Sequence, residues 1–376
     1  MMLGAIKQSK LGVDMDRETK RKVGSGNVCH SPGKSCVATA RCVIKKTYLH
    51  TFSFDSDGFE DGEAQCACLH DVKKCSAMLL DDAEKRTLVL SSGNSQLHEV
   101  DLERGCVVRQ LGMPECVTAI TYGAHVPRPE PVYTCLTVKA VFNEDLRMPY
   151  RRSTVSKSEC VVTWCSPATR KGTLNCHATS SCGHLVTGDS WGVVRLCTAW
   201  PSSCCPGGEC GLEEMRILLE ARTPILDVDV TADGKYALAT TRACLFFLRT
   251  YDIENGCSYV RRSGKGSSEL KPLRLQPTNE QANLLGGTDK LNFTSGKFDR
   301  YGVGQEVCIT ACGGKLICTW DFETVISAME KGLNACQPHG FWVGKRVREV
   351  SAPTAHNVMY LTDDDIRMAP LICRSY

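Results

Sequence analysis

The sequence predicts an all-β protein built from repeated four-stranded units, and three observations support this. Short runs of β-branched, Leu, Cys and aromatic residues recur from about residue 75, and four of them follow one another between residues 76 and 111. Four strands in about 40 residues is the size of one β-propeller blade. Helical periodicity is scarce, whereas an α/β enzyme needs helices between most of its strands. Trp320-Asp321 ends a predicted strand, which is the position of the WD dipeptide in WD-repeat blades.

The same strand and turn pattern recurs along the chain. Residues 174–198, 225–250 and 305–322 each contain two or three short apolar runs, and Asp233-Gly234 is a strong hairpin signal. We place the third strand of each unit near Val43, Leu97, Val138, Val193, Cys244, Leu316 and Ile366. Neighbouring positions in this series are 41 to 72 residues apart, against about 40–45 in ordinary WD blades. Several loops must therefore be enlarged, above all between Gly256 and Gly304. We predict a WD40-like β-propeller of seven blades, with six or eight left open, closed by its terminal strands.

Two segments have a different pattern. Residues 322–332 place apolar side chains at helical spacing, and Gly332 follows as a stop signal, so we expect a helix there. Residues 212–221 fit a helix or a strand equally well.

The domain organisation is expected to be simple. Residues 1–35 are polar and contain the basic run Lys20-Arg21-Lys22, which predicts a flexible basic leader, and residues 36–376 form the propeller. The first residues lack the apolar stretch of a signal peptide, and no window of 18 apolar residues predicts a transmembrane helix. We therefore expect a cytoplasmic protein in a reducing compartment.

Composition excludes some classes of function. The net charge is only +3, so no nucleic-acid partner is expected. The chain has 24 cysteines, and structural zinc sites usually show Cys-x₂₋₄-Cys pairs. No two cysteines here have two residues between them, and Cys308 and Cys312, with three between them, are expected to span a strand and a turn. The clusters Cys204, Cys205 and Cys210, and Cys66, Cys68 and His70 are the closest to a metal site. Most other cysteines sit among apolar strand residues, where cysteine packs as a small hydrophobe, as at Cys160, Cys244 and Cys318.

One motif could indicate catalysis. Gly188-Asp-Ser190-Trp-Gly192 matches the G-x-S-x-G nucleophile elbow, which needs a strand followed by a helix. Here a strand precedes and a strand-like run follows, so we expect a hairpin turn instead. Asp227 and Asp229 alternate with apolar residues in one strand, where one of them is expected to anchor a turn rather than to form a catalytic pair.

Other candidate motifs are weaker. Gly340 to Lys345 has one residue too few for a P-loop, and Gly302-Val-Gly304 lacks the third glycine of a dinucleotide fingerprint. Asp363 to Asp365 is expected to be a solvated turn, and His177 a packed residue. The basic stretches 147–152 and 261–265 are expected to lie on loops.

Several segments resemble a known family. LHEVDLERGCVV (97–108), TPILDVDVTADGKYALATT (223–241) and LICTWDFETVI (316–326) are similar to the C-terminal propeller of the vacuolar import and degradation protein 27 family, over residues 66–367. That family usually carries a pleckstrin-homology-like region before the propeller, where this chain has only a short leader. The resemblance implies a propeller that acts in vesicle- or vacuole-linked protein turnover.

The expected function is binding rather than catalysis. We expect a non-catalytic scaffold that presents propeller loops to protein partners, with peripheral vesicle association as a further expectation. No residue is assigned as catalytic, cofactor-binding or metal-binding, and no cofactor is expected. Two alternatives remain: a zinc- or redox-responsive scaffold using Cys204, Cys205 and Cys210, and a serine hydrolase using Ser190.

Overall fold

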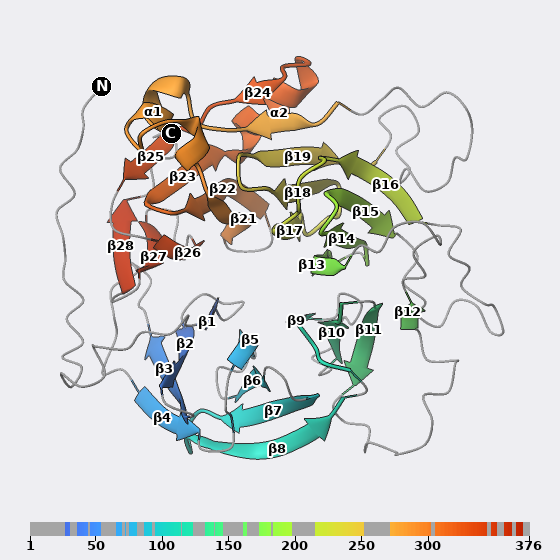
Figure 1. Ribbon diagram of the computed structural model, residues 1–376, viewed down its shortest axis with the longest axis vertical. Coiled ribbons are helices and arrows are strands. Elements are labelled where there is room, and N and C mark those ends of the chain that lie inside the picture. Colours follow the sequence, from blue (N-terminus) through green and yellow to red (C-terminus); the bar gives the residue numbers. More distant parts are fainter. Residues whose placement is uncertain are drawn as a thin grey trace.

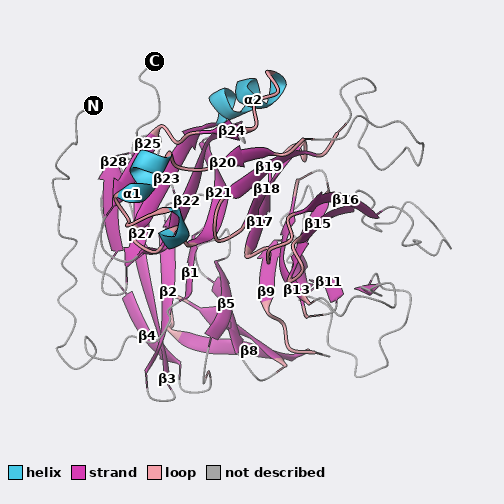
Figure 2. Ribbon diagram, turned by 45° about the horizontal axis from the view of Figure 1, so that its top comes forward, coloured by secondary structure: helices cyan, strands magenta, loops and turns pink. Residues whose placement is uncertain are grey.

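The protein is described from a computed structural model. It describes residues 27–30, 36–43, 46–53, 65–69, 72, 75–80, 86–91, 95–113, 115–122, 132–138, 140–145, 161–163, 173–181, 183–197, 215–251, 271–301, 305–343, 347–351, 357–362 and 366–370. Strands dominate this part of the chain and form seven sheets arranged around a common centre (Figure 1). The predicted all-β class is confirmed, and Figure 2 shows how few helices accompany the strands.

The first three sheets follow the chain in order and contain four strands each. Their strands are β1 (Asn27–His30), β2 (Cys36–Val43), β3 (Lys46–Ser53) and β4 (Gln65–Leu69); β5 (Cys75–Leu80), β6 (Arg86–Ser91), β7 (Gln96–Asp101) and β8 (Cys106–Gly112); and β9 (Ala119–Tyr122), β10 (Val132–Leu136), β11 (Ala140–Asp145) and β12 (Val161–Thr163).

The remaining four sheets complete the arrangement, and one strand departs from chain order. Their strands are β13 (Leu174–Thr179), β14 (Leu185–Asp189), β15 (Val193–Cys197) and β16 (Met215–Glu220); β17 (Asp227–Val230), β18 (Tyr236–Thr240), β19 (Leu245–Arg249), β20 (Leu273–Leu275) and β24 (Ala335–Cys336); β21 (Phe293–Tyr301), β22 (Gln305–Gly313), β23 (Leu316–Asp321) and β25 (Gly340–Val343); and β26 (Val347–Ser351), β27 (Asn357–Thr362) and β28 (Ile366–Pro370). The helices are α1 (Asn279–Asn283) and α2 (Phe322–Glu330), with a 3₁₀ turn at Thr288–Lys290.

The first strand of each sheet lies nearest the centre (Figure 1). Neighbouring inner strands contact one another, as β1 does β5, β13 does β17, and β17 does β21. This is the arrangement of a β-propeller, although the last sheet has three described strands, so the blade count stays a prediction. The expected closure by shared terminal strands is not formed among the described residues, because β1 pairs only within β1–β4 and β28 only within β26–β28.

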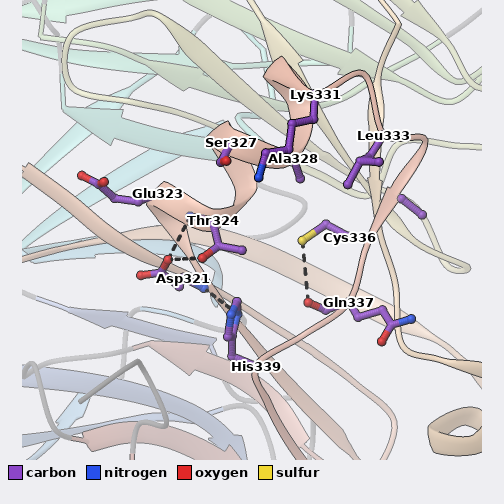
Figure 3. Close-up of a pocket in the computed structure, with 11 residues that line it drawn as sticks. Asp321, Glu323, Thr324, Ser327, Ala328, Lys331, Leu333, Cys336, Gln337 and His339 are labelled. Atoms are coloured by element: carbon purple, nitrogen blue, oxygen red, sulfur yellow. Dashed lines mark hydrogen bonds between the residues drawn. The ribbon is translucent and has the colours of Figure 1, made fainter. Parts of the chain in front are cut away.

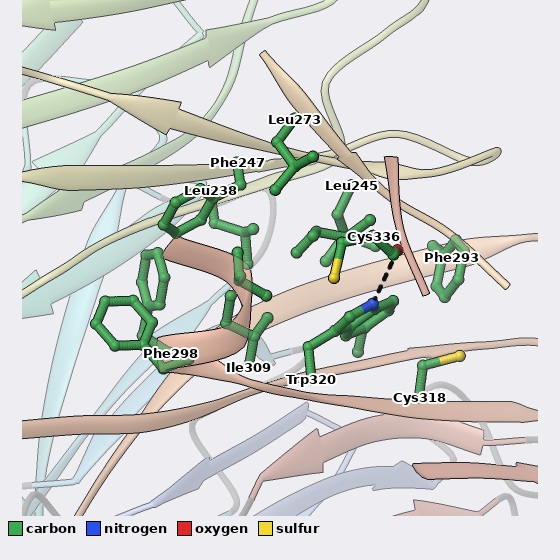
Figure 4. Close-up of a cluster of buried hydrophobic side chains, with 14 of the residues drawn as sticks. Leu238, Leu245, Phe247, Leu273, Phe293, Phe298, Ile309, Cys318, Trp320 and Cys336 are labelled. Carbon is green, nitrogen blue, oxygen red and sulfur yellow. Dashed lines mark hydrogen bonds between the residues drawn. The ribbon is translucent and has the colours of Figure 1, made fainter. Parts of the chain in front are cut away.

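Neighbouring sheets are held together by side chains buried between them. In the cluster of Figure 4, the ring of Phe247 packs edge-on against that of Phe298 in the next sheet, and Trp320 of that sheet belongs to the same cluster and is fully buried. The indole Nε1 of Trp320 donates a hydrogen bond to the carbonyl oxygen of Cys336 at 3.3 Å, which satisfies its polar atom in an apolar environment. The WD dipeptide therefore anchors the sheet pair: its Trp fills the core and its Asp321 begins α2.

The predicted third strands are confirmed at most positions. Leu97, Val193, Leu316 and Ile366 lie in the third strands of their sheets, and Cys244 directly precedes β19. Two placements were wrong. Val43 ends the second strand β2, and Val138 lies in the turn between β10 and β11, where Thr137 and Ala140 are joined by backbone hydrogen bonding. Both stand in β-rich runs without Gly or Pro, so the sequence did not mark the turn.

The structure also bears on the expected helix, the ambiguous segment 212–221 and the expected leader. Helix 322–332 is confirmed as α2, and 212–221 contains the strand β16. Strand β1 lies within the stretch expected to be a leader and pairs with β2, while residues 1–26 and 31–35 lie outside the described residues, so the division into leader and propeller stays a prediction. In the described part of the chain, none of the helices has the length and apolarity to cross a bilayer.

Candidate functional site

Two carboxylates on β17 join it to the inner strand of the next sheet. The Oδ2 of Asp229 accepts a hydrogen bond from the backbone N–H of Phe298 at 2.8 Å, and Asp227 Oδ2 lies 2.8 Å from Lys297 Nζ. Burial raises the pKa of the Asp227 carboxyl, and the Lys297 ammonium opposes this. The two aspartates therefore act between sheets.

The expectation that one of these aspartates anchors a turn was wrong. The turn after β17 is held by Asp233, whose Oδ1 accepts from Thr231 Oγ1 at 2.7 Å and from the backbone N–H of Lys235 at 3.0 Å. Gly234 adopts φ 72°, as the predicted Asp-Gly hairpin requires. The misassignment arose because the side chains of β17 reach across to β21, which sequence spacing does not show.

Ser190 lies in the turn between β14 and β15, so the predicted hairpin is confirmed. Its Oγ accepts a hydrogen bond from the backbone N–H of Thr173 at 3.1 Å. A Cβ on Gly188 would lie 2.5 Å from Ile225 Cγ2, and Gly192 has φ 88° against the backbone of Thr223. Both glycines of the motif are thus required by packing, and a strand rather than a helix follows the serine.

The Asp189 side chain organises this turn. Its Oδ1 accepts from the backbone N–H groups of Trp191 and Val193, both at 2.9 Å, and its Oδ2 forms an ion pair with Arg195 at 2.7 Å. All three partners of the Asp189 carboxylate belong to the same hairpin. The carboxylate therefore fixes the conformation of the turn that contains Ser190.

His177 is a packed residue, as expected. It is buried in β13, and its Nε2 lies 3.0 Å from Thr121 Oγ1 and 3.3 Å from the carbonyl oxygen of Thr134. Burial lowers the pKa of His177 to about 4, with the Thr134 carbonyl acting in the opposite direction. The ring is therefore neutral at physiological pH and joins β13 to the neighbouring sheet.

Eight of the twelve cysteines whose burial the structure describes lie in the core, as predicted for Cys244 and Cys318. Burial raises the pKa of both thiols, so they stay protonated. Among the described residues, no group of three potential ligands gathers at a metal site. Several sequence candidates lie outside the described residues: Cys160, Cys204, Cys205, Cys210, His70, residues 147–152, 261–265, 302–304 and 363–365. Of the P-loop-like stretch, residues 340–343 form β25.

A surface groove of about 630 Å³ lies beside α2, on the outer side of the ring (Figure 3). Its residues come from α2 and from the segment that includes β24: Asp321, Glu323, Thr324, Ser327, Ala328, Lys331, Leu333, Ala335, Cys336, Gln337 and His339. Ala328 and Cys336 are buried at its floor, and Leu333 is 52% exposed. We call this the α2 groove, and it is the candidate site.

Local sequence signals explain the shape of the α2 groove. The Asp321 carboxylate caps α2 by accepting from the backbone N–H and the hydroxyl of Thr324, at 2.9 and 2.6 Å. At the other end, Gly332 has φ 68°, and the N–H groups of Gly332 and Leu333 donate to the carbonyls of Met329 and Ala328. This is a Schellman motif, and it reverses the chain so that the following residues run back along the helix.

Strand β24 then fixes this returning segment to the preceding sheet. It pairs in parallel with β20, at Arg274–Ala335 and Leu275–Cys336. The chain thus leaves its own sheet after β23, forms α2, adds two residues to the neighbouring sheet, and comes back as β25. The helical spacing of residues 322–332 predicts α2, whereas β24 has only two residues, which carry no strand periodicity.

The α2 groove contains the residue types of a thiol hydrolase, but they are not assembled for catalysis. Burial raises the pKa of the Cys336 thiol, and its Sγ donates to the carbonyl oxygen of Gln337 at 3.7 Å. A nucleophilic cysteine needs a lowered pKa and a paired base. The imidazole of His339 instead accepts at Nδ1 from the backbone N–H of Asp321 at 3.3 Å, while the Asp321 carboxylate caps α2.

Most of the chain matches one known protein family. The profile of the VID27 C-terminal WD40-like domain matches residues 70–336. The chain belongs to the VID27 family.

Within this VID27 domain, the match includes the inner aspartates of β17, the Ser190 hairpin, α2 and β24, so nearly all of the α2 groove lies inside the family region. The resemblance that the sequence segments indicated is therefore confirmed. No curated protein sequence matches this VID27 chain.

Solved β-propellers share the fold of this VID27 chain. The Cps50 (Swd1) β-propeller domain of Myceliophteria thermophila aligns with a TM-score of 0.57 at 10% identity, covering 93% of this chain and 96% of that one. Hsv2 of Kluyveromyces lactis aligns with a TM-score of 0.54 at 8% identity, covering 90% and 89%. At this identity the likeness shows the fold, and the WD40-like β-propeller prediction is confirmed.

Proposed function

We propose that this chain is a non-catalytic protein-interaction scaffold of the cytoplasm, whose α2 groove is a binding site for a protein partner. The family name suggests vesicle- or vacuole-linked protein turnover as the process, with peripheral vesicle association. The proposal rests mainly on one observation: an excursion of the chain between two sheets builds a groove of about 630 Å³ with an exposed Leu333 at its rim.

The chemistry of the described residues supports binding over catalysis. The Ser190 hydroxyl lies in a hairpin turn and accepts from the backbone N–H of Thr173, and burial raises the pKa of the Cys336 thiol. A partly exposed apolar side chain beside charged residues is instead a common feature of protein interfaces.

The test compares two about equally exposed apolar residues in different parts of the fold. Leu333 is 52% exposed in the α2 groove, and Ile217 on β16 is 51% exposed. The tagged full chain is expressed in the source cell as wild type, Leu333→Asp or Ile217→Asp, and co-purifying proteins are quantified. We expect a partner in stoichiometric amount with wild type and Ile217→Asp, and a loss of about tenfold with Leu333→Asp. Equal recovery with all three chains, or no enriched partner with wild type, would refute the proposal.

A further inference from the structure

We propose that the α2 groove binds an extended segment of the partner, which adds alongside β24 and carries a basic and an acidic side chain about four residues apart. This inference rests on the proposed function and deepens it, because it states the chemistry of the partner and the mode of binding.

The first support is the open edge of β24. This strand is the last in its sheet, with β20 on one side only. The backbone N–H groups of Arg274 and Gln276 donate to the carbonyls of Asn334 and Cys336, at 3.1 and 3.2 Å. Backbone groups alternate in direction along an extended strand, so the N–H and carbonyl of Ala335 between them point away from β20. Ala335 lines the α2 groove, which makes this edge available to an added strand.

The second support is the charge at each end of the groove. Glu323 lies in the first turn of α2 and Lys331 directly follows the helix; both are exposed and line the groove (Figure 3). Neither has an ion-pair partner within the described part of the chain. An acidic residue at the start and a basic residue at the end of a helix also interact favourably with the helix dipole. The two charges therefore point to a ligand because the open strand edge lies between them.

The spacing of these charges sets the spacing in the partner. Glu323 and Lys331 are eight residues apart on a helix, which corresponds to about 12 Å along its axis. An extended chain covers that distance in about four residues at roughly 3.3 Å each. Between the charges, the buried Ala328 and Cys336 and the exposed Leu333 form an apolar floor and rim. The middle of the bound segment is therefore expected to be apolar.

The test uses synthetic nine-residue peptides and the purified full chain. Three of the peptides have a central Val flanked by alanines and two charged residues placed four positions apart. The charged residues are Lys and Glu in the first peptide, two Lys in the second and two Glu in the third. Wild type should bind the Lys/Glu peptide about fivefold more tightly than either like-charged peptide, since an exposed ion pair contributes up to about 1 kcal/mol. Lys331→Glu should prefer the two-Lys peptide and Glu323→Lys the two-Glu peptide. Because each variant reverses one charge on the surface, both also control for folding.

A fourth peptide tests the strand addition itself. The Lys/Glu peptide is N-methylated on alternate backbone amides, in one version at the odd positions and in a second version at the even positions. One of the two patterns removes the N–H donors that face β24, and that version should bind about tenfold more weakly. Equal affinity for all charged peptides, or no effect of N-methylation in either register, would overturn the proposal.

Two other occupants would also overturn it, and each has its own signature. A second copy would appear as a concentration-dependent dimer in sedimentation that Leu333→Asp abolishes. The chain itself contains Lys265 and Glu269 at the required spacing; if changing both to Ala raised peptide affinity tenfold, the chain's own segment would be the occupant. If the peptides fail while the partner in cells still depends on Leu333, this inference fails and the proposed function stands.

Discussion

Asp229 is predicted to stabilise the propeller through its hydrogen bond between two sheets, whereas Asp227, two residues earlier on the same strand, is predicted to contribute less through its ion pair. The Asp229 carboxylate accepts from the backbone N–H of Phe298 at 2.8 Å, and in Asp229→Ala this partly buried donor loses its acceptor. Hydrogen bonds to charged groups contribute about 1.5–3 kcal/mol, so we expect the free energy of unfolding to fall by about that amount.

Asp227→Ala is the matched control, because it removes the same side chain from the same strand. Its partner Lys297 is 39% exposed, and burial raises the pKa of the Asp227 carboxyl, which shows that the site disfavours the charged form. A partly exposed ion pair of this kind contributes less than about 1 kcal/mol. Asp229→Asn keeps an oxygen acceptor and should cost less than Asp229→Ala.

The assay is urea denaturation followed by tryptophan fluorescence, checked against circular dichroism so that a single transition is established. The midpoint should fall clearly for Asp229→Ala and only slightly for Asp227→Ala, with the same slope. Equal losses in the two alanine variants, or a larger loss for Asp227→Ala, would refute the assignment of Asp229 as the stronger of the two links between the sheets.

Three further predictions concern buried or turn positions. Gly188→Ala should cost about 1–3 kcal/mol through overpacking, whereas Gly112→Ala, whose Cβ would meet nothing within 4 Å, should change the thermal midpoint little; similar shifts in both would contradict the packing assignment. Ser190→Ala should lower stability by about 1 kcal/mol, and a serine-reactive probe should label wild type no more than the variant; Ser190-dependent labelling would restore the hydrolase alternative. His177 has a pKa lowered from 6.5 to about 4, so between those values the unfolded chain binds a proton that the folded chain does not. Stability should therefore fall by up to about 3 kcal/mol as the pH drops from about 6.5 to about 4, and His177→Gln should show a smaller fall in denaturation midpoint; identical pH profiles would contradict it.

Local patterns predicted the sheets well where turns are chemically marked. The blade at 225–250 was placed correctly because Asp233-Gly234 separates two apolar runs, and its strands β17, β18 and β19 follow that division. Val138 was misplaced because the turn between β10 and β11 has no such marker. Helix α1 was missed although Thr278 and Gln281 form a capping box, since five residues give too little periodicity.

The candidate site was harder to predict than the fold. Asp321, the helix and the Gly332 stop were visible in the sequence, but the groove exists only because β24 pairs with β20, about 60 residues earlier in the chain. The roles of Asp227 and Asp229 have the same origin, because both depend on contacts with the next sheet. Periodicity reports on neighbours along one element and carries no information on which sheets become adjacent.

The central claim, that the chain functions by binding a protein partner in the α2 groove, is tested most directly by photo-crosslinking in the source cell. A photoreactive amino acid replaces Leu333 in one chain and Ile217 in another, and these two side chains are about equally exposed in different parts of the fold. We predict a discrete crosslinked product from position 333 and none from position 217. The absence of a product at 333, or the same products from both positions, would contradict the account.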